Sequence, residues 1–307
     1  MPGESTTVPL PSVEQGRVVV PAPDRVPGSW AGAPHAILDD GVYWLSYRVR
    51  HATAPERAQT RGVETVVARS EDGEQFEAVA RIEREGFGTD SFERPCLVRR
   101  PHGGWRLYVC CATPGSKHWW IEAIDADEPS GLPVGHRTVV FPGSDALAVK
   151  DPIVDVDAAG EWRAWICCHP LTEAGEEDRM TTAYATSSDG LSWDWHGDVL
   201  HPTPGTWDQR GARMTTILSS EPLVVLYDGR ASAEENWFEK TGIARERDGV
   251  LAADPGGPAA TSPHSDGGLR YATAVPLSDG CTRFYFEAAS PDGAHDLWTS
   301  ISPALAG

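Results

Sequence analysis

A pair of short apolar segments recurs five times along this chain of 307 residues. In each pair, a segment of alternating residues is followed by a turn and then by a second segment that is richer in aromatic residues. The pairs begin at Ala33, Arg94, Asp151, Arg213 and Tyr271, so they are spaced by 61, 57, 62 and 58 residues. A regular period of this size is typical of repeat architectures, and a repeat unit made of strands favours a propeller blade over a helical solenoid.

The same repeats predict how each blade is built. Most of them contain a third strand-like segment, such as VETVVARS or TTAYATSS, and a weaker fourth, such as RTVVF or DWHGDVL. Two connections carry an Asp-Gly hairpin, SEDGEQF from Ser70 and SSDGLSW from Ser187, in which glycine supplies the positive φ of a tight turn. The sequence therefore predicts an all-β protein, a five-bladed β-propeller with four-stranded antiparallel blades around a central channel.

We expect a single domain, because the repeats run nearly from end to end. Residues 1–15 are predicted to form an irregular tail and residues 16–307 the propeller. The last sheet needs one more strand, which the segment GRVVVPA at 16–22 is expected to supply. The predicted blades cover residues 28–82, 88–141, 144–200, 205–252 and 265–302.

Charge and composition limit the possible partners. The formal net charge of −19 opposes binding to nucleic acid or to an anionic membrane, since both need cationic contacts. No apolar stretch is long enough to span a bilayer, and the first residues lack the pattern of a signal peptide, so we expect a cytoplasmic location. The adjacent cysteine pairs at 110–111 and 167–168 are expected to be small buried hydrophobes. We predict neither a metal nor a cofactor.

Charged residues recur where the predicted strands would meet around the channel. In an antiparallel meander, the first strand starts at the edge of the sheet where the second strand ends, so these positions from five blades surround one mouth. The carboxylates at or next to these positions are Glu93, Asp151, Asp228 and Glu287. The basic residues there are Arg48, Arg94, Lys150, Arg213 and Arg270.

The chain resembles the five-bladed β-propeller glycoside hydrolases, a clan that includes arabinanases, xylosidases, invertases, levanases and the mannoside phosphorylases. The resemblance covers almost the whole chain. It rests on Asp151-Pro152 at the opening of the third blade and on the stretch SSDGLSWDWHGDVLHPTPGTWDQRG from Ser187 to Gly211. It also rests on the recurrent order of apolar strand, Asp-Gly turn and aromatic strand. The resemblance implies a carbohydrate substrate, a small molecule or an oligosaccharide, in a central funnel.

Cleavage of a glycosidic bond normally needs two carboxyl groups, one to protonate the leaving oxygen and one to activate water or attack carbon. In much of the clan, an Asp of the first blade and a Glu of the fourth blade do this, while an Asp of the third blade orients them. Only the third-blade residue is matched here, by Asp151. Ala33 and Ala212 stand where the other two carboxylates would be expected.

We therefore expect Asp151 to orient the reacting groups or to act as general acid, and Glu93 or Glu287 to be the second carboxylate. Asp228 completes the candidate catalytic set. Neighbouring arginines and burial would have to separate the pKa values of these carboxyl groups. The candidate substrate-binding residues are Arg94, Arg213, Arg270, Tyr47, Arg48, His169, Trp30, Trp207 and Trp237.

Three functions stay open at this point. The first is a glycoside hydrolase-like enzyme that uses carboxylate acid and base chemistry. The second is a phosphate-dependent or anionic-sugar-processing enzyme, because the planar fork of arginine suits carboxylate and phosphate. The third is a non-catalytic carbohydrate-binding propeller, since the first and fourth blades lack the expected carboxylates. The arginines would also be explained if they form buried salt bridges between blades.

Overall fold

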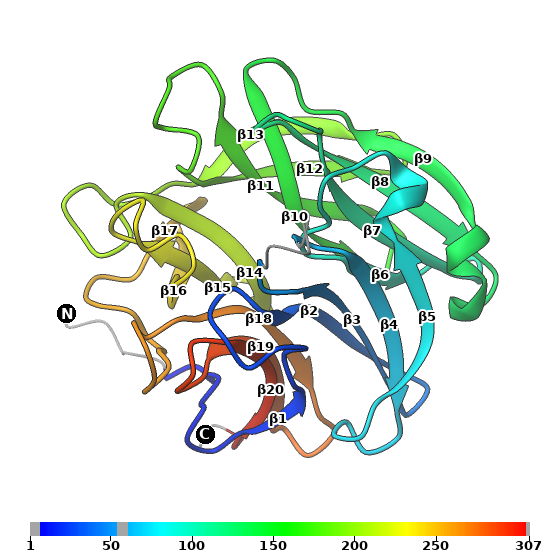
Figure 1. Cartoon of the computed structure of the whole chain (residues 1–307), viewed down its shortest axis with the longest axis horizontal. Helices are drawn as coiled ribbons and strands as arrows, with labels where there is room; N and C mark the ends of the chain where they lie inside the picture. The colour runs from blue at the N-terminus through cyan, green and yellow to red at the C-terminus, as the bar shows by residue number, and fades with distance from the viewer. Residues whose placement is uncertain (1–6, 54–60, 305–307) are drawn as a thin grey trace.

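A computed structural model describes residues 7–53 and 61–304. Within these ranges the chain is nearly all β, with two short 3-10 helices. The strands form a five-bladed β-propeller, as the sequence predicts, and the first strands of the blades meet around a central axis (Figure 1). The sequence-based domain limits, 1–15 and 16–307, stay a prediction.

Each blade is an antiparallel meander that runs outward from the axis. The first blade contains β2 (Trp30–Asp39), β3 (Val42–Arg50), β4 (Glu64–Ser70) and β5 (Glu77–Glu83). The second contains β6 (Cys96–Arg99), β7 (Trp105–Ala112), β8 (Trp119–Ala126) and β9 (His136–Phe141). The 3-10 helix η1 (Arg84–Phe87) precedes this blade, and η2 (Pro129–Val134) lies in the connection between β8 and β9. The third contains β10 (Leu147–Val156), β11 (Trp162–Pro170), β12 (Thr181–Ser187) and β13 (Asp194–Leu200). The fourth contains β14 (Gly211–Ser220), β15 (Leu223–Arg230), β16 (Lys240–Arg247) and β17 (Val250–Ala253).

The fifth blade combines both ends of the described chain. It contains β18 (Leu269–Pro276), β19 (Thr282–Ala289) and β20 (His295–Ser302), and its outer strand is β1 (Arg17–Val20). β1 pairs antiparallel with β20, with Arg17 opposite Thr299. The N-terminal segment therefore supplies the fourth strand of the blade that the C-terminal segment builds.

Both predicted Asp-Gly hairpins have the same internal hydrogen bonds. In the first, Ser70 Oγ donates to Asp72 Oδ1 at 2.8 Å, and the backbone N–H of Gly73 donates to Ser70 Oγ at 2.9 Å. The turn at residues 187–190 repeats these bonds at 3.0 and 2.8 Å. A tyrosine from the preceding blade donates its O–H to the glycine carbonyl of each turn at 2.8 Å, and these are Tyr285 and Tyr108. The hairpins thus tie neighbouring blades together.

The hydrophobic core lies between the blades. The largest cluster of buried apolar side chains joins Tyr108 and Phe141 of the second blade to Trp162 and Ile166 of the third. Similar clusters lie between other neighbouring blades, because each sheet presents apolar residues on both faces. Five of the six free cysteines are buried, as expected for small apolar side chains.

Three first strands carry the same irregularity near the axis. The pairing register shifts in β2, β10 and β18, where an extra residue bulges out of the ladder. The bulged residues are Ala33, Asp151 and Tyr271, with φ of 52°, 52° and 56°. Positive φ is uncommon and costly for residues other than glycine, and bulges redirect side chains near functional sites. The repeat thus places one strained residue per blade next to the central cavity in three of the five blades.

No helix within the described ranges is long and apolar enough to cross a membrane. In the same ranges, no group of three or more histidine, cysteine or acidic residues could hold a metal ion.

Candidate functional site

A cavity of about 280 Å³ lies where residues from all five blades converge. Its walls come from the starts of first strands, the ends of second strands and the loops beside them, as the propeller geometry predicts. The lining residues are Trp30, Arg48, Arg50, Arg61, Glu93, Lys117, Lys150, His169, Met180, Arg213, Arg230, Asn236, Trp237, Glu239, Arg270 and Tyr271.

A larger cavity of about 570 Å³ lies elsewhere, between the outer strands of the third and fourth blades. On its wall Asp198 is exposed and Arg163 and Glu246 are half-buried, so none of its charged side chains is fully buried. The central cavity, in contrast, is lined by several buried charged side chains. Perturbed ionisable groups in a cleft are typical of functional sites, so we take the central cavity as the candidate site.

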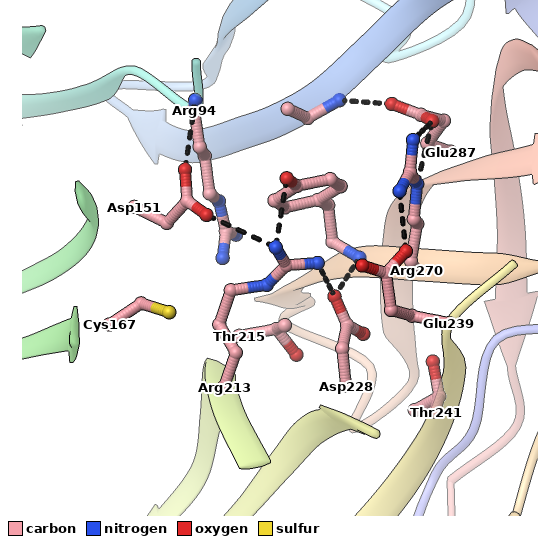
Figure 2. A network of polar contacts seen from close by, with 12 residues as sticks. Arg94, Asp151, Cys167, Arg213, Thr215, Asp228, Glu239, Thr241, Arg270 and Glu287 are labelled. Atoms are coloured by element: carbon pink, nitrogen blue, oxygen red, sulfur yellow. Dashed lines mark hydrogen bonds and ion pairs between the residues drawn. The ribbon is translucent and has the colours of Figure 1, made fainter. Parts of the chain in front are cut away.

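Arg213 lies between two buried carboxylates behind the cavity wall (Figure 2). Its Nη1 donates to Asp151 Oδ2 at 3.1 Å, and its Nη2 donates to Asp228 Oδ2 at 2.7 Å. Asp151 also accepts the backbone N–H of Arg94 at 3.2 Å, and Asp228 that of Tyr271 at 2.9 Å. Burial raises the pKa of Asp228 to about 6, against the attraction of Arg213. Both carboxylates are fully buried and face protein donors.

Glu287 is another buried carboxylate with several hydrogen-bond donors around it. Its side chain accepts hydrogen bonds from the backbone N–H of Ala33 at 3.0 Å, from Arg270 Nε at 2.8 Å and from His295 Nδ1 at 2.8 Å. Arg48 Nη2 lies 3.3 Å from the same carboxylate. Burial alone would raise the pKa of Glu287, but Arg270 and Arg48 outweigh it and hold this pKa well below its usual range.

Glu239 is a further buried carboxylate that is paired with arginines. Its Oε1 accepts from Arg230 Nη1 at 2.7 Å, and its Oε2 accepts from Arg270. Although Glu239 lines the cavity, it is only 1% exposed and both of its oxygens are engaged. Burial opposes its charge, but Arg270 and Arg230 prevail and lower its pKa.

Glu93 differs from the other carboxylates because it reaches the cavity with free hydrogen-bonding capacity. It is 8% exposed, and its Oε2 accepts from Arg48 Nε at 2.7 Å. No side chain or backbone group in the described residues donates to its Oε1. Burial would raise its pKa, but Arg48 and Lys150 outweigh burial and lower the pKa to about 2. At neutral pH this group is therefore an anion.

Tyr271 brings a neutral phenol to the same cavity. Its hydroxyl accepts a hydrogen bond from Arg213 Nη1 at 2.9 Å, and the guanidinium carbon of Arg213 lies 3.8 Å from its ring centroid. Burial raises the pKa of Tyr271 well above its usual value. Its O–H keeps its proton and finds no acceptor among the described residues, so it can donate to a ligand.

His169 is neutral as well. Its Nδ1 donates to the carbonyl oxygen of Glu177 at 3.1 Å, which leaves Nε2 without a proton. Burial lowers the pKa of His169 well below its usual value, and the nearby cations Lys150 and Arg230 lower it further.

The structure brings most of the sequence-predicted site residues to the cavity or directly behind it. Trp30, Arg48, Glu93, His169, Arg213, Trp237 and Arg270 line it. Arg94, Asp151, Asp228 and Glu287 are buried in the network behind the wall and do not line the cavity.

Two of the predicted residues lie elsewhere. Tyr47 precedes Arg48 in β3, so it points to the opposite face of the sheet and packs in a hydrophobic cluster. Burial there raises its pKa to about 12. Trp207 stacks on Tyr227 with 5.8 Å between ring centroids. It fills the space above glycines 229 and 242 instead of facing the cavity.

Sequence reasoning did not select several of the lining residues. Tyr271 starts the fifth repeat and Arg230 ends the second strand of its blade. The repeats therefore place both residues around the mouth, but the sequence gives neither of them a role. Arg61 stands in a connection that no repeat pattern marks, and Glu239 directly precedes β16.

No protein-family model matches the chain, and no curated protein matches its sequence. Solved structures with the same fold include a thermostable family-43 glycoside hydrolase, with a TM-score of 0.65 and 14% identity over 88% of each chain. They also include the β-1,2-mannobiose phosphorylase from Listeria innocua, with a TM-score of 0.62 and 15% identity over 98% of this chain and 95% of that one.

A third similar structure is an N-acetylgalactosamine deacetylase from F. plautii, with a TM-score of 0.64 and 12% identity over 97% of this chain and 95% of that one. The neighbours thus include members of the propeller glycoside hydrolase clan that the sequence resembles. At these identities the similarity shows the fold, while the chemistry has to be argued from the site itself.

Proposed function

We propose that this protein processes a glycoside in the central cavity and that Glu93 is the carboxylate next to the reacting carbon. The observation that carries the proposal is the position of Glu93. It is the one carboxylate of the described cavity wall with an oxygen that no protein group occupies. The fold that the chain shares with glycoside hydrolases and phosphorylases supports the same class of substrate.

The low pKa of Glu93 favours one chemical role over another. A carboxyl group that is ionised at neutral pH cannot protonate the leaving oxygen, but it can stabilise the positive charge of an oxocarbenium-like transition state. It can also attack the anomeric carbon, in which case the bond to the leaving oxygen breaks and that oxygen takes a proton. Tyr271 is our candidate donor of that proton, because its phenol stays protonated on the cavity wall.

A second candidate function is a non-catalytic carbohydrate-binding propeller. It is favoured by the pairing of the other four acidic residues, Asp151, Asp228, Glu239 and Glu287, with buried arginines. Such pairs make the cavity wall rigid, but they leave few carboxyl groups that could transfer a proton. The cytoplasmic location expected from the sequence stays a prediction under either function.

The test is turnover of nitrophenyl pyranosides, furanosides and uronides, each with and without inorganic phosphate. Release of nitrophenol supports the proposal, and acceleration by phosphate shows that phosphate takes the glycosyl group in place of water. Saccharide binding measured by calorimetry, with no turnover of any glycoside that binds, would instead establish the binding propeller.

A further inference from the structure

The arginines deepest in the central cavity are neutralised by carboxylates. Four of them contact acidic side chains within 3.3 Å. The arginines are Arg48, Arg213, Arg230 and Arg270, and the acids are Glu93, Asp151, Asp228, Glu239 and Glu287. This inner layer therefore carries no excess of positive charge.

Four more cations line the same cavity without such partners, and we call them the outer cations: Arg50, Arg61, Lys117 and Lys150. Lys150 lies 3.8 Å from Asp151, whose carboxylate is already engaged by Arg213. Arg50 donates its Nε–H to the carbonyl oxygen of Gly28 at 3.1 Å. In the part of the chain that the structure describes, Arg50, Arg61 and Lys117 form no ion pair.

The outer cations gather around aromatic rings. The guanidinium carbon of Arg61 lies 5.7 Å from the ring centroid of Trp119, and Nζ of Lys150 lies 5.2 Å from the ring of the same residue. Lys117 stands two residues before Trp119 in the chain. Arg50 lies between Trp30 and Trp237, at 4.1 and 4.9 Å from their centroids. Cations from three blades therefore face one space.

Two observations favour the binding of an anion in this space. Arg48 is 1% exposed, yet its Nη1 has no hydrogen-bond partner in the described structure. Buried donors are nearly always satisfied, so a ligand acceptor would explain this one. In addition, burial and then the positive charge of Arg48 beside it lower the pKa of Arg50 to about 10, so the charge of Arg50 is unfavourable here without an anion.

This concentration of positive charge is unusual in a protein that is acidic overall. Its formal net charge is −19, but its central cavity gathers the outer cations, of which Arg50, Arg61 and Lys117 form no ion pair among the described residues. Like charges held together in a partly desolvated site are unfavourable unless an opposite charge joins them. A cavity of about 280 Å³ is at the small end of ligand sites, so the anion belongs to a small ligand.

We propose that the ligand is a saccharide with an acidic substituent, a carboxylate or a sulfate or phosphate ester, and that the outer cations bind this substituent. The inference rests on the proposed function, because it assigns the charge of the glycoside that Glu93 would contact. The proposal also explains why aromatic residues lie beside the outer cations. Their rings hold the guanidinium and ammonium groups in place through cation–π contacts.

The experiment compares matched neutral and acidic sugars by isothermal titration calorimetry of the full chain. The pairs are glucose with glucuronate, galactose with galacturonate, and glucose with its 6-phosphate and 6-sulfate, and inorganic phosphate is measured alone. We expect at least one acidic sugar to bind about 10-fold or more tightly than its neutral partner, because hydrogen bonds to charged groups are the stronger ones. The difference should shrink as salt is added.

The double variant Arg61→Gln/Lys117→Gln tests the residues. Both side chains are exposed, so the variant is expected to fold normally, which its thermal unfolding will check. It should bind the acidic sugar about as weakly as the neutral one. Arg69→Gln is the matched control, because Arg69 is an exposed arginine of β4 away from the cavity and should leave the preference unchanged.

Equal affinity within every pair overturns the inference. So does an affinity for inorganic phosphate that equals the affinity for the sugar phosphate, since the saccharide would then contribute nothing. Failure of the proposed function gives a different result: acidic sugars would bind preferentially, but no acidic or neutral glycoside that binds would be cleaved.

Discussion

Arg48 connects Glu93 to Glu287, since its Nε donates to Glu93 at 2.7 Å while its Nη2 lies 3.3 Å from the buried carboxylate of Glu287. The carboxylate on the cavity wall is therefore held by an arginine that is itself fixed from behind. This arrangement keeps Glu93 ionised and restricts its position. Preorganised charges of this kind stabilise a developing positive charge without reorganisation during the reaction.

The first prediction concerns the variant Arg48→Lys. Lysine keeps the positive charge but cannot contact both carboxylates with one planar group, so the pKa of Glu93 should rise from about 2 toward its usual value. The acidic limb of the pH profile of kcat/KM should then move to higher pH. Arg69→Lys, on the exposed face of β4, should leave the profile unchanged. An unchanged acidic limb in Arg48→Lys would contradict the role given to this pair.

The second prediction concerns Asp228 and pH. Its pKa is raised to about 6 in the folded protein, above the usual value near 3.8, so the folded state binds this proton more tightly than the unfolded state. The stabilisation from protonated Asp228 is complete below about pH 4 and is lost as pH rises to 6. Unfolding by urea should show that the wild type loses stability relative to Asp228→Asn across this window. A difference that instead grows in favour of the wild type would mean that the pKa of Asp228 is depressed.

The third prediction concerns Gly32 in β2. A Cβ atom added there would lie 2.0 Å from Oε2 of Glu287, a carboxylate that is buried and fixed by several donors. Gly32→Ala should therefore lower the free energy of unfolding by about 2 kcal/mol or more, because a buried ion pair is displaced. Gly86→Ala is the control, since nothing lies within 4 Å of its Cβ position. Equal denaturation midpoints for the two variants would contradict this account.

The fourth prediction compares two aspartates of β10. Asp151→Asn removes the charge opposite Arg213 inside the protein and should cost about 3 kcal/mol of stability. Asp155→Asn removes the partner of Arg163 at a partly exposed site and should cost less than about 1 kcal/mol. Chemical denaturation of both variants provides the measurement. Asparagine also tolerates the positive φ at position 151, so the backbone should not obscure the comparison.

The blades could be predicted from the sequence because the repeat carries them. The segment predicted from DWHGDVL coincides with β13, and both Asp-Gly turns form at the predicted glycines. These features depend on local residues and on a period of about 60. Local chemistry and repetition are visible in a sequence without knowledge of spatial contacts.

The site was less predictable because its charges are paired between blades. Arg213 neutralises Asp151, which is 62 residues away in the sequence, and no local sequence pattern predicts such a pair. The orientation of Glu93 was also open, since one residue of register reverses a strand side chain. In the structure Glu93 precedes β6, so strict alternation does not apply to it. Glu93 lines the cavity, while the Arg94 guanidinium donates to the carbonyl oxygen of Pro34 and to the Thr273 hydroxyl.

The most direct test of the central claim is the kcat/KM of Glu93→Gln on any glycoside that the wild type cleaves. Glutamine keeps the size and the hydrogen-bond acceptor but removes the charge, so we predict a loss of at least about 100-fold, mainly in kcat. Glu77→Gln, an exposed carboxylate of β5, should retain full activity. A Glu93→Gln variant that folds normally and turns over at the wild-type rate would contradict the assignment of Glu93 as the reacting carboxylate.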